Sequence, residues 1–299
     1  MKIAITGGTG LVGKALSNEL VRNGHEVFIL TRKVKEQSIE GKRFVQWLNP
    51  GDQPESQLEG IDAIVNLAGA TINGRWTEEY KQKIIDSRTK ATTEVKRIIK
   101  ELKNKPDVLI NASAVGYYGT SLAVEFNEQS GPGNDFLADT VQRWESAANE
   151  VKELGTRVVL CRFGLILDKT EGALPRMVLP YKFFGGGKVG TGHQWLSWIH
   201  ITDVIRGIIL SIESSKLQGP VNFVAPCPVT MDQFGKTLSK VMKRPHWLPV
   251  PAFVLKIALG EMSMLVLEGQ KAIPEKLLNA GFSFQYPELE KALREILSK

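Results

Sequence analysis

Short apolar runs recur along the first 163 residues and predict a series of buried strands. Amphipathic stretches separate several of these runs, and in the first of them Val12, Leu16 and Leu20 recur every fourth residue before Gly24 ends the helix. Strands that alternate with helices predict an α/β protein with a doubly wound parallel sheet and right-handed crossovers. The apolar runs occupy residues 2–6, 26–30, 43–47, 62–69, 107–113 and 157–163.

Two longer helices are expected to supply crossovers in this sheet. Thr77 can cap a helix that runs to about Lys103, with acidic residues in its first turn, where the helix dipole favours them. A second helix is expected over 136–154, where Gly155 stops it.

The pattern changes after Phe163. Residues 183–198 are rich in glycine and tryptophan and predict an ordered loop, whereas 221–225 predict one more strand. Thr230 and Gln233 form a capping-box pattern that starts another helix. We therefore expect a smaller C-terminal lobe beside the main sheet.

The overall composition is that of an ordinary globular protein. Of the 299 residues, 42% are hydrophobic and 23% charged, which is enough to bury a normal core. The net charge is +6, but the basic residues are dispersed, and the densest run, 96–105, is interrupted by apolar and acidic residues. We therefore expect no nucleic-acid partner, although a mild positive field favours an anionic ligand.

The chain has no apparent targeting or membrane segment. No run approaches the roughly 18 apolar residues that a membrane helix needs. Met1 leads directly into the strand at 2–6, without the charged and long apolar regions of a secretory signal, so none is expected. Cys161 and Cys227 are expected to be reduced and mostly packed thiols, which fits a reducing compartment. We expect a cytoplasmic protein with no membrane partner. The four histidines lack ligand spacing, so no metal site is expected.

Three glycines spaced G-x-x-G-x-x-G connect the first strand to the first helix. Gly7 would permit a tight turn, Gly10 would let a pyrophosphate approach the backbone, and Gly13 would let the helix pack close to the sheet. The helix N-terminus then favours the phosphates. Because the motif follows a strand and opens a helix, it predicts a dinucleotide site in a Rossmann-type fold.

The end of the second strand bears on which dinucleotide binds. A carboxylate there would hold the ribose hydroxyls of NAD, but the chain has Thr31, Arg32 and Lys33 instead. Arg32 could hold the 2′-phosphate of NADP. The alternative is that these cations form only a solvated strand end. We favour NADP(H) as the cofactor.

Five motifs occur in the order found in one enzyme family. These motifs are TGGTGLVG, NLAGA, NASAVGYYG, RFGLIL and WIHITDV. Across essentially its whole length the chain resembles atypical extended short-chain dehydrogenases/reductases, and more closely the "epimerase family" proteins of the NAD-dependent epimerase/dehydratase group, which carry a C-terminal domain of unassigned function. The resemblance implies a Rossmann domain over 1–164 plus about 196–225. It also implies a small substrate lobe over about 165–195 plus 226–299.

The resemblance also implies which residues would line the cofactor. NLAGA would lie along it, Arg88 takes the position of an asparagine near the ribose, and RFGLIL would pass beside the nicotinamide. The expected cofactor-binding residues are Gly7, Gly8, Thr9, Gly10, Leu11, Val12, Gly13, Thr31, Arg32, Leu67, Ala68, Gly69, Arg88, Ala112, Gly164 and Leu165.

The family's usual acid/base pair is missing. Family members carry a tyrosine with a lysine four residues later, and the lysine lowers the pKa of the tyrosine so that it can move a proton. No Tyr-x-x-x-Lys occurs anywhere in this chain. By position, the tyrosine is replaced by Phe136 or Leu137 and the lysine by Thr140 or Val141.

The stretch NASAVGYYG therefore supplies the expected catalytic hydroxyls. Ser113, Tyr117 and Tyr118 follow a buried strand at the sheet edge where ligands of such folds bind. Ser113 lies one residue before the usual serine position, which is Ala114. The alternative is that all three only pack and hydrogen bond. The 183–198 loop, with Lys188, is a second source of substrate contacts.

Two functions stay open on these grounds. The first is an NADP(H)-dependent oxidoreductase or epimerase that acts on an unknown small molecule with non-standard catalytic residues. The second is a non-catalytic NADP(H)-sensing or scaffold protein. A homodimer is left open beside a monomer.

Overall fold

The computed structural model describes residues 1–33 and 41–298. Its centre is a seven-stranded sheet in the order β11-β7-β5-β4-β1-β2-β3, and every neighbouring pair of strands in it is parallel. This arrangement confirms the α/β, Rossmann-type fold class. The strands are β1 (Lys2–Thr6), β2 (Glu26–Thr31), β3 (Lys42–Gln46), β4 (Ala63–Asn66), β5 (Val108–Ala114), β7 (Arg157–Phe163) and β11 (Gly219–Phe223).

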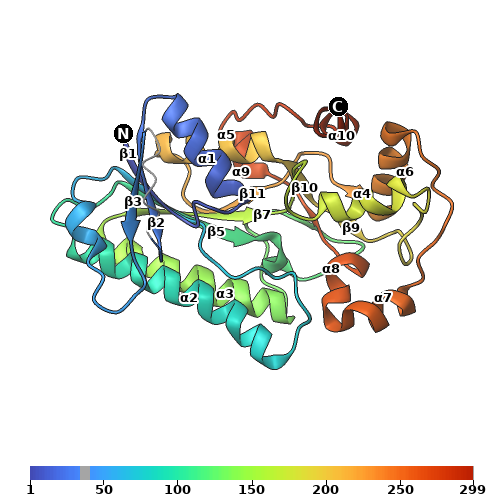
Figure 1. Cartoon of the computed structure of the whole chain (residues 1–299), viewed down its shortest axis with the longest axis horizontal. Helices are drawn as coiled ribbons and strands as arrows, with labels where there is room; N and C mark the ends of the chain where they lie inside the picture. The colour runs from blue at the N-terminus through green and yellow to red at the C-terminus, as the bar shows by residue number, and fades with distance from the viewer. Residues whose placement is uncertain (34–40, 299) are drawn as a thin grey trace.

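Helices cover both faces of the sheet, as the labels in Figure 1 show. Helices α1 (Leu11–Arg22) and α5 (Ile201–Glu213) lie on one face, and α2 (Glu78–Glu101) and α3 (Phe136–Asn149) lie on the other. Each face has its own buried apolar cluster, because alternate strand residues point to opposite sides. Ile3 and Ile5 belong to the first cluster, whereas Ala4 belongs to the second.

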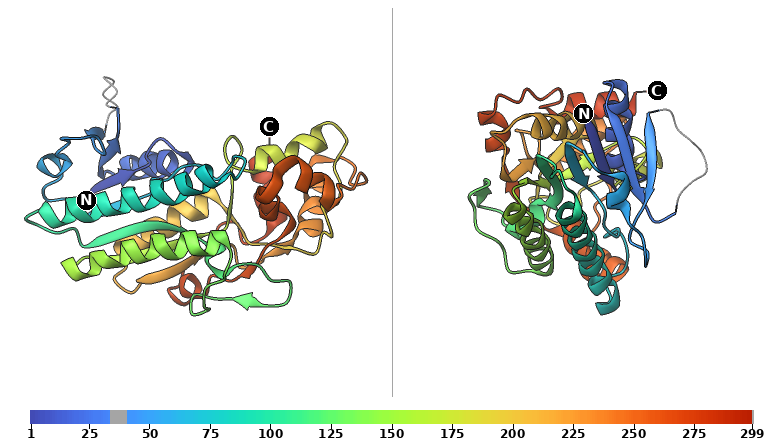
Figure 2. Two further views of the ribbon diagram at one scale, coloured as in Figure 1. Left: turned by 90° about the horizontal axis from the view of Figure 1, so that it is seen from below. Right: turned by 90° about the vertical axis from the view of Figure 1, so that its left-hand side faces the viewer.

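A smaller lobe lies at one end of the molecule, on the right in the left panel of Figure 2. Its core joins α4 (Leu174–Lys182), α6 (Met231–Met242) and α10 (Leu289–Leu297) around the buried Trp198. The domain boundaries that we expected stay a prediction. The remaining elements are β6 (Glu125–Phe126), β8 (Leu165–Leu167), β9 (Trp195–Leu196), β10 (Trp198–His200), β12 (Val229–Thr230), β13 (Lys271–Ala272), α7 (Ala252–Leu259), α8 (Met264–Leu267) and α9 (Glu275–Asn279), with 3₁₀ helices at Pro54–Gln57, Val115–Tyr118, Glu150–Leu154 and Gly260–Ser263.

The expected helix boundaries rest on specific capping contacts. The Thr77 side chain accepts a hydrogen bond from the Tyr80 amide at the start of α2. Thr230 and Gln233 form the full capping box of α6. Gly155 ends the segment after α3 with a φ of 85°, which glycine adopts without steric cost.

The structure shows the state of the two cysteines and whether a helix could span a membrane. Both cysteines are free thiols. Cys161 is buried in β7 as expected, whereas Cys227 is exposed, because it lies in the segment after β11 and not inside a strand. No helix in the described parts of the chain is long and apolar enough to cross a membrane. Within residues 1–33 and 41–298, no three His, Cys, Asp or Glu side chains are grouped so that they could hold a metal ion.

Candidate functional site

The glycine loop between β1 and α1 contains two glycines that the fold itself requires. Gly7 has a φ of 66°, and a Cβ there would lie 2.7 Å from the Leu67 carbonyl oxygen. A Cβ on Gly13 would collide with the Gly7 carbonyl oxygen. These two positions bring the first turn of α1 against the loop and the end of β4.

Gly10 differs, because no packing contact excludes a side chain there. A Cβ at Gly10 would meet only the Gly7 carbonyl oxygen, at 3.4 Å. Gly10 is also the N-cap of α1, where no side chain makes a capping hydrogen bond and the first turn carries no acidic residue. The backbone N–H groups of Leu11 and Val12 therefore begin a helix whose positive end is open to an anion. This cradle fits a pyrophosphate.

A buried polar network fixes the strand ends beside this loop. The Thr6 hydroxyl donates to Asn66 Oδ1 (2.6 Å) and accepts from the amides of Leu67 (3.0 Å) and Ala68 (3.1 Å). Asn66 Nδ2 in turn donates to Asn111 Oδ1 (2.7 Å). The network ties β1, β4 and β5 together and sets the backbone of the segment expected along the cofactor. In the sequence, the only sign of this network is that Thr6, Asn66 and Asn111 are polar residues within otherwise apolar strands.

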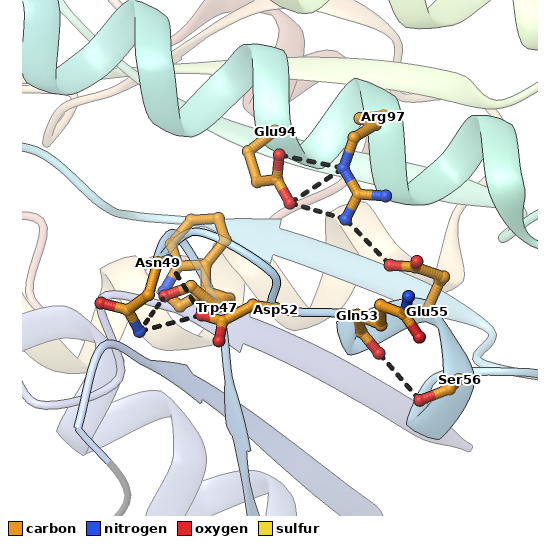
Figure 3. Close-up of polar contacts among 8 residues, drawn as sticks. All are labelled: Trp47, Asn49, Asp52, Gln53, Glu55, Ser56, Glu94 and Arg97. Atoms are coloured by element: carbon orange, nitrogen blue, oxygen red, sulfur yellow. Dashed lines mark hydrogen bonds and ion pairs between the residues drawn. The ribbon is translucent and has the colours of Figure 1, made fainter.

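The end of β2 is held by the segment that follows β3. Asn49 Nδ2 donates to the Arg32 carbonyl oxygen (3.1 Å), and both the amide and the Nδ2 of Asn49 bond Asp52 Oδ2 at 2.8 and 2.9 Å, as Figure 3 shows for the second pair. The Arg32 side chain is exposed and makes no ion pair with the described residues. Its guanidinium is thus free, within the described chain, to meet a ligand phosphate.

The same segment is anchored to α2. Arg97 of α2 bonds Glu55 at 2.9 Å and Glu94 at 2.8 Å (Figure 3). The hydrogen bond from Arg97 lowers the pKa of Glu55, so this carboxylate stays charged and keeps the contact at neutral pH. The Asn49 turn and the 3₁₀ helix at Pro54–Gln57 are therefore attached to the rigid helix layer.

A cavity of about 270 Å³ lies beyond the carboxyl end of β5, where ligands of open α/β sheets bind. Gly164 and Leu165, expected beside the nicotinamide, line it, as does Arg88. Ala112 lies two residues before Ala114 in β5 and is buried. The other lining residues include Ile72, Ala114, Thr120, Asp135, Leu137, Val141, Trp144, Trp195, Ser197, Met264, Leu265, Glu268 and Gln270.

The family's catalytic positions face this cavity with apolar side chains. Leu137 and Val141, four residues apart on α3, line it together with Ala114. Of the two alignments that we left open, Leu137 with Val141 is the one that places both positions on the cavity with the required spacing. That these positions correspond to the family's serine, tyrosine and lysine stays a prediction; the side chains of Ala114, Leu137 and Val141 themselves cannot transfer a proton.

Arg88 is the cation of this cavity. It donates to the carbonyl oxygens of Ala70 (3.1 Å) and Ile84 (3.0 Å), and it lies 5.0 Å above the Trp144 ring. It makes no ion pair within the described chain, and burial lowers its pKa to about 10. Gly69 packs against it, since a Cβ there would lie 3.3 Å from the Arg88 side chain. Arg88 remains charged at neutral pH and can attract an anionic group.

Ser113, Tyr117 and Tyr118 gather around Arg162 on β7. The Ser113 hydroxyl donates to Glu145 (2.5 Å), and Glu145 forms a buried two-point pair with Arg162 at 2.8 Å for each bond. The Arg162 guanidinium lies 3.5 Å from the centre of the Tyr117 ring. The Tyr118 hydroxyl donates to Asn222 (2.7 Å) and accepts from Arg162 (3.0 Å).

The contacts of Ser113, Tyr117 and Tyr118 around Arg162 favour a structural role over proton transfer. Burial raises the pKa of Tyr118, and the nearby Arg162 only partly opposes that effect. Although burial disfavours its charge, Glu145 raises the pKa of Arg162. None of Ser113, Tyr117 and Tyr118 lines the cavity. The contacts favour the packing alternative, and a catalytic role for these residues stays a prediction.

The glycine- and tryptophan-rich loop, residues 183–198, contributes to the cavity through its C-terminal end. Trp195 and Leu196 line it, whereas Gln194 is buried and bonds the carbonyl oxygens of Val189 and Val266. Lys188 and His193 are not among the lining residues. His200 has a structural role, because its Nδ1 accepts a hydrogen bond from the Thr202 amide and caps α5.

Two polar contacts join the second lobe to the sheet-bearing part of the molecule near the cavity. Lys81 of α2 forms an ion pair with Glu261 (2.5 Å), and the Thr120 hydroxyl donates to Glu268 (2.9 Å). Segment 264–270 thereby forms one wall of the cavity. The polar groups that line the cavity include Thr120, Asp135, Thr140, Ser197, Glu268 and Gln270. Of these, Thr120, Asp135 and Glu268 were not expected from the sequence.

Known proteins with similar sequences cover the whole chain. The model of the NAD dependent epimerase/dehydratase family matches residues 3–224, and a domain of unknown function (DUF1731) matches residues 250–296. The epimerase family protein YfhF of Bacillus subtilis strain 168 is 50% identical over 299 residues, which are 100% of this chain and 98% of that protein.

Solved structures give the same assignment. The crystal structure of human epimerase family protein SDR39U1 (isoform 2) with NADPH has a TM-score of 0.88 and 33% identity, with 99% of both chains covered. UDP-glucuronic acid 4-epimerase from Bacillus cereus in complex with NAD has a TM-score of 0.79 over 98% of this chain and 96% of that one. At 17% identity, the second likeness concerns the fold alone. The chain belongs to the NAD-dependent epimerase/dehydratase family.

Proposed function

We propose that this protein binds NADP(H) and uses it in an oxidoreductase or epimerase reaction on a small molecule. The observation that carries the cofactor assignment is the pairing of an open Gly10 cradle with Arg32 at the end of β2. A carboxylate at this strand end would favour NAD, whereas a cation favours the 2′-phosphate. The human relative whose structure was determined with NADPH supports the same choice.

The residues present suggest how NADP(H) would be held. The pyrophosphate would meet the α1 N-terminus at Gly10–Val12, and the 2′-phosphate would meet Arg32 beside Thr31. The nicotinamide end would lie against Gly164 and Leu165 in the cavity. When bound, the cofactor would supply or accept a hydride. The chain's own apolar groups, Leu137 and Val141, would exclude water from that place.

Proton transfer in such a reaction would need a group other than the family tyrosine. Ser113, Tyr117 and Tyr118 remain our sequence-based prediction, although they lie around Arg162. Asp135 and Glu268 line the cavity itself and are carboxylates of a kind that serves as acid or base. Arg88 would orient an anionic substrate group.

A non-catalytic NADP(H) sensor is the second candidate function. The observation that favours it is that Ala114, Leu137 and Val141, which we align with the usual serine, tyrosine and lysine, line the cavity with apolar side chains. A sensor would need cofactor affinity and a change in the second lobe, but no proton transfer. The two candidates share the cofactor and differ in turnover.

One set of measurements separates these candidates. Isothermal titration should give a tighter Kd for NADPH than for NADH, and NADPH oxidation should then be followed over a panel of aldehydes, ketones and nucleotide sugars. Substrate-dependent oxidation that Asp135→Asn or Glu268→Gln reduces at least tenfold would support the enzyme. Equal Kd values for the two cofactors would contradict the NADP(H) assignment. Tight NADPH binding without turnover across the panel would favour the sensor.

A further inference from the structure

The second lobe exposes an apolar patch that the proposed function does not use. Large apolar side chains gather in two segments, 183–184 and 247–257. Their exposed fractions are 77% for Phe183, 53% for Phe184, 67% for Trp247, 49% for Leu248, 64% for Phe253 and 79% for Ile257. Monomeric proteins rarely expose so many large apolar groups in one place without a binding role.

Specific contacts make the two segments one surface. Trp247 Nε1 donates to the Phe184 carbonyl oxygen (2.8 Å), and the amides of Trp247 and Leu248 both donate to the Gly186 carbonyl oxygen, at 2.9 and 3.1 Å. The aromatic rings are thus presented by a braced loop pair, and their exposure is a property of the folded lobe.

Helix α7 continues the patch directly after this loop. It has no buried residue, although its sequence AFVLKIAL is mostly apolar. Phe253 and Ile257 are four residues apart and therefore share one helix face. Figure 1 places α7 at the outer lower edge of the second lobe, away from the sheet. A helix this apolar needs a partner surface to cover it.

The segments that carry the patch have charges of a single sign, and the Asp232 carboxylate approaches them at His246, at 3.3 Å. Residues 172–202 and 233–260 contain no aspartate or glutamate but eight lysines and arginines. Two of the eight are paired with acids outside these segments, as Lys236 is with Asp232 and Lys240 with Glu290. The Arg244 guanidinium lies 4.4 Å above the Phe184 ring, within the patch itself.

We propose that this patch docks the protein on a bilayer surface that carries anionic lipids. Aromatic and aliphatic side chains would enter the interface, and the segments that carry them contain cations and no acidic residue, which matches the hydrophobic and the electrostatic attraction of such a surface. A partner protein would need a surface that is both apolar and acidic to match the patch. A second copy would bring its own lysines and arginines against those of the first, and the like charges would repel. The proposal replaces our expectation of no membrane partner, which considered only membrane-spanning segments, and it does not depend on the proposed function.

Vesicle binding by the full chain tests the proposal. Vesicles of phosphatidylcholine with about a third phosphatidylglycerol should bind the protein at least tenfold more tightly than pure phosphatidylcholine vesicles. Trp247→Ser with Ile257→Ser, and separately Lys243→Glu with Arg244→Glu, should each weaken that binding at least tenfold. Leu278→Ser and the pair Lys83→Glu with Lys90→Glu are matched controls outside the patch, and they should bind as the unmodified protein does.

Tryptophan emission, circular dichroism and sedimentation velocity complete the test. Emission of the unmodified protein should shift to shorter wavelength on anionic vesicles, and Trp247→Phe should bind equally while losing most of the shift. Circular dichroism should show that every variant is folded. Absence of binding to anionic vesicles, or equal loss in the control variants, would overturn the proposal. A dimer in sedimentation velocity that Trp247→Ser with Ile257→Ser separates into monomers would assign the patch to a second copy and would also overturn it.

Discussion

At the scale of single residues, Gly10 and Gly13 offer opposite tests of the glycine loop. Gly10→Val should leave the fold intact, because only the Gly7 carbonyl lies near a Cβ there, but it should abolish NADPH binding by filling the phosphate cradle. Gly13→Ala should lower the melting temperature, because its Cβ would strike backbone. Calorimetry and thermal unfolding measure the two effects, with Gly131→Ala, which has open space around it, as the control. Undiminished NADPH binding by folded Gly10→Val would place the phosphates elsewhere.

Arg32 is the residue expected to discriminate between the two nicotinamide cofactors. A charge-assisted contact to the 2′-phosphate should contribute about 1.5–3 kcal/mol, or roughly tenfold to a hundredfold in Kd. Arg32→Ala should therefore weaken NADPH binding by that factor and leave NADH binding unchanged, as titration would show. Arg22→Ala, an exposed arginine at the far end of α1, is the control. If Arg32→Ala left the preference for NADPH intact, Lys33 would be the next candidate.

Tyr118 distinguishes the structural and catalytic readings of NASAVGYYG. Tyr118→Phe would leave Asn222 Oδ1 and one Arg162 N–H without their partner in a buried place, which should cost about 1–3 kcal/mol of unfolding free energy. NADPH affinity should not change. Denaturant unfolding measures the cost, and Tyr286→Phe, whose hydroxyl has only a weak exposed contact, is the control. Unchanged stability with a 10²–10⁴-fold loss of turnover would instead mark a general acid or base.

At the scale of elements, the start of α5 depends on a neutral histidine. His200 is buried, accepts the Thr202 amide on Nδ1 (3.1 Å), and contacts Glu295 through Nε2 (2.9 Å). Burial lowers the pKa of His200, and Glu295 only partly offsets this effect. The unfolded chain therefore binds more protons between the lowered pKa and about 6.5, the ordinary value for histidine.

The resulting stability should be complete above about pH 6.5 and be lost as the pH falls through the folded-state pKa of His200. His200→Asn keeps a capping side chain but removes the titration. The unfolding free energy of the unmodified protein should therefore fall more steeply between about pH 7 and pH 5 than that of His200→Asn. His193→Asn, at an exposed position, is the control and should follow the unmodified protein. Parallel curves for the unmodified protein and His200→Asn would show that this cap does not titrate in that range.

At the scale of the whole molecule, the cofactor should stabilise both lobes as one unit. Ligand that binds only the folded state adds about 2.7 kcal/mol at a hundredfold excess over Kd. NADPH should therefore raise the melting temperature more than NADH at equal concentration, and it should not raise that of Gly10→Val. Scanning calorimetry makes the comparison. A separate transition for the second lobe, unmoved by NADPH, would show that the latch at Lys81 and Glu261 does not couple the lobes.

The local pattern of the sequence was sufficient for the fold class and for the glycine turn between β1 and α1. Short continuous apolar runs identify the strands because both faces of this sheet are buried, and apolar residues at every fourth position identify a helix because a helix buries one face. The glycines at 7, 10 and 13 mark a turn whose geometry depends on few neighbours. The caps at Thr77 and Thr230 were equally local. The absence of Tyr-x-x-x-Lys was also visible directly in the sequence.

Side-chain direction was decided by the tertiary structure. Ser113 lies at the end of β5 and Tyr118 in the 3₁₀ helix that follows, both at the ligand edge of the sheet. Both nevertheless bond into a buried network around Arg162 of β7 and Glu145 of α3, because a buried charge must be paired. In the same way, the second lobe brought Glu268 to the cavity from 148 residues beyond Thr120. Periodicity within one element carries no information about such partners, since these contacts form only when distant segments pack. The sequence by itself therefore determined the fold class and the glycine turn between β1 and α1, and packing between distant segments decided which side chains face the cavity.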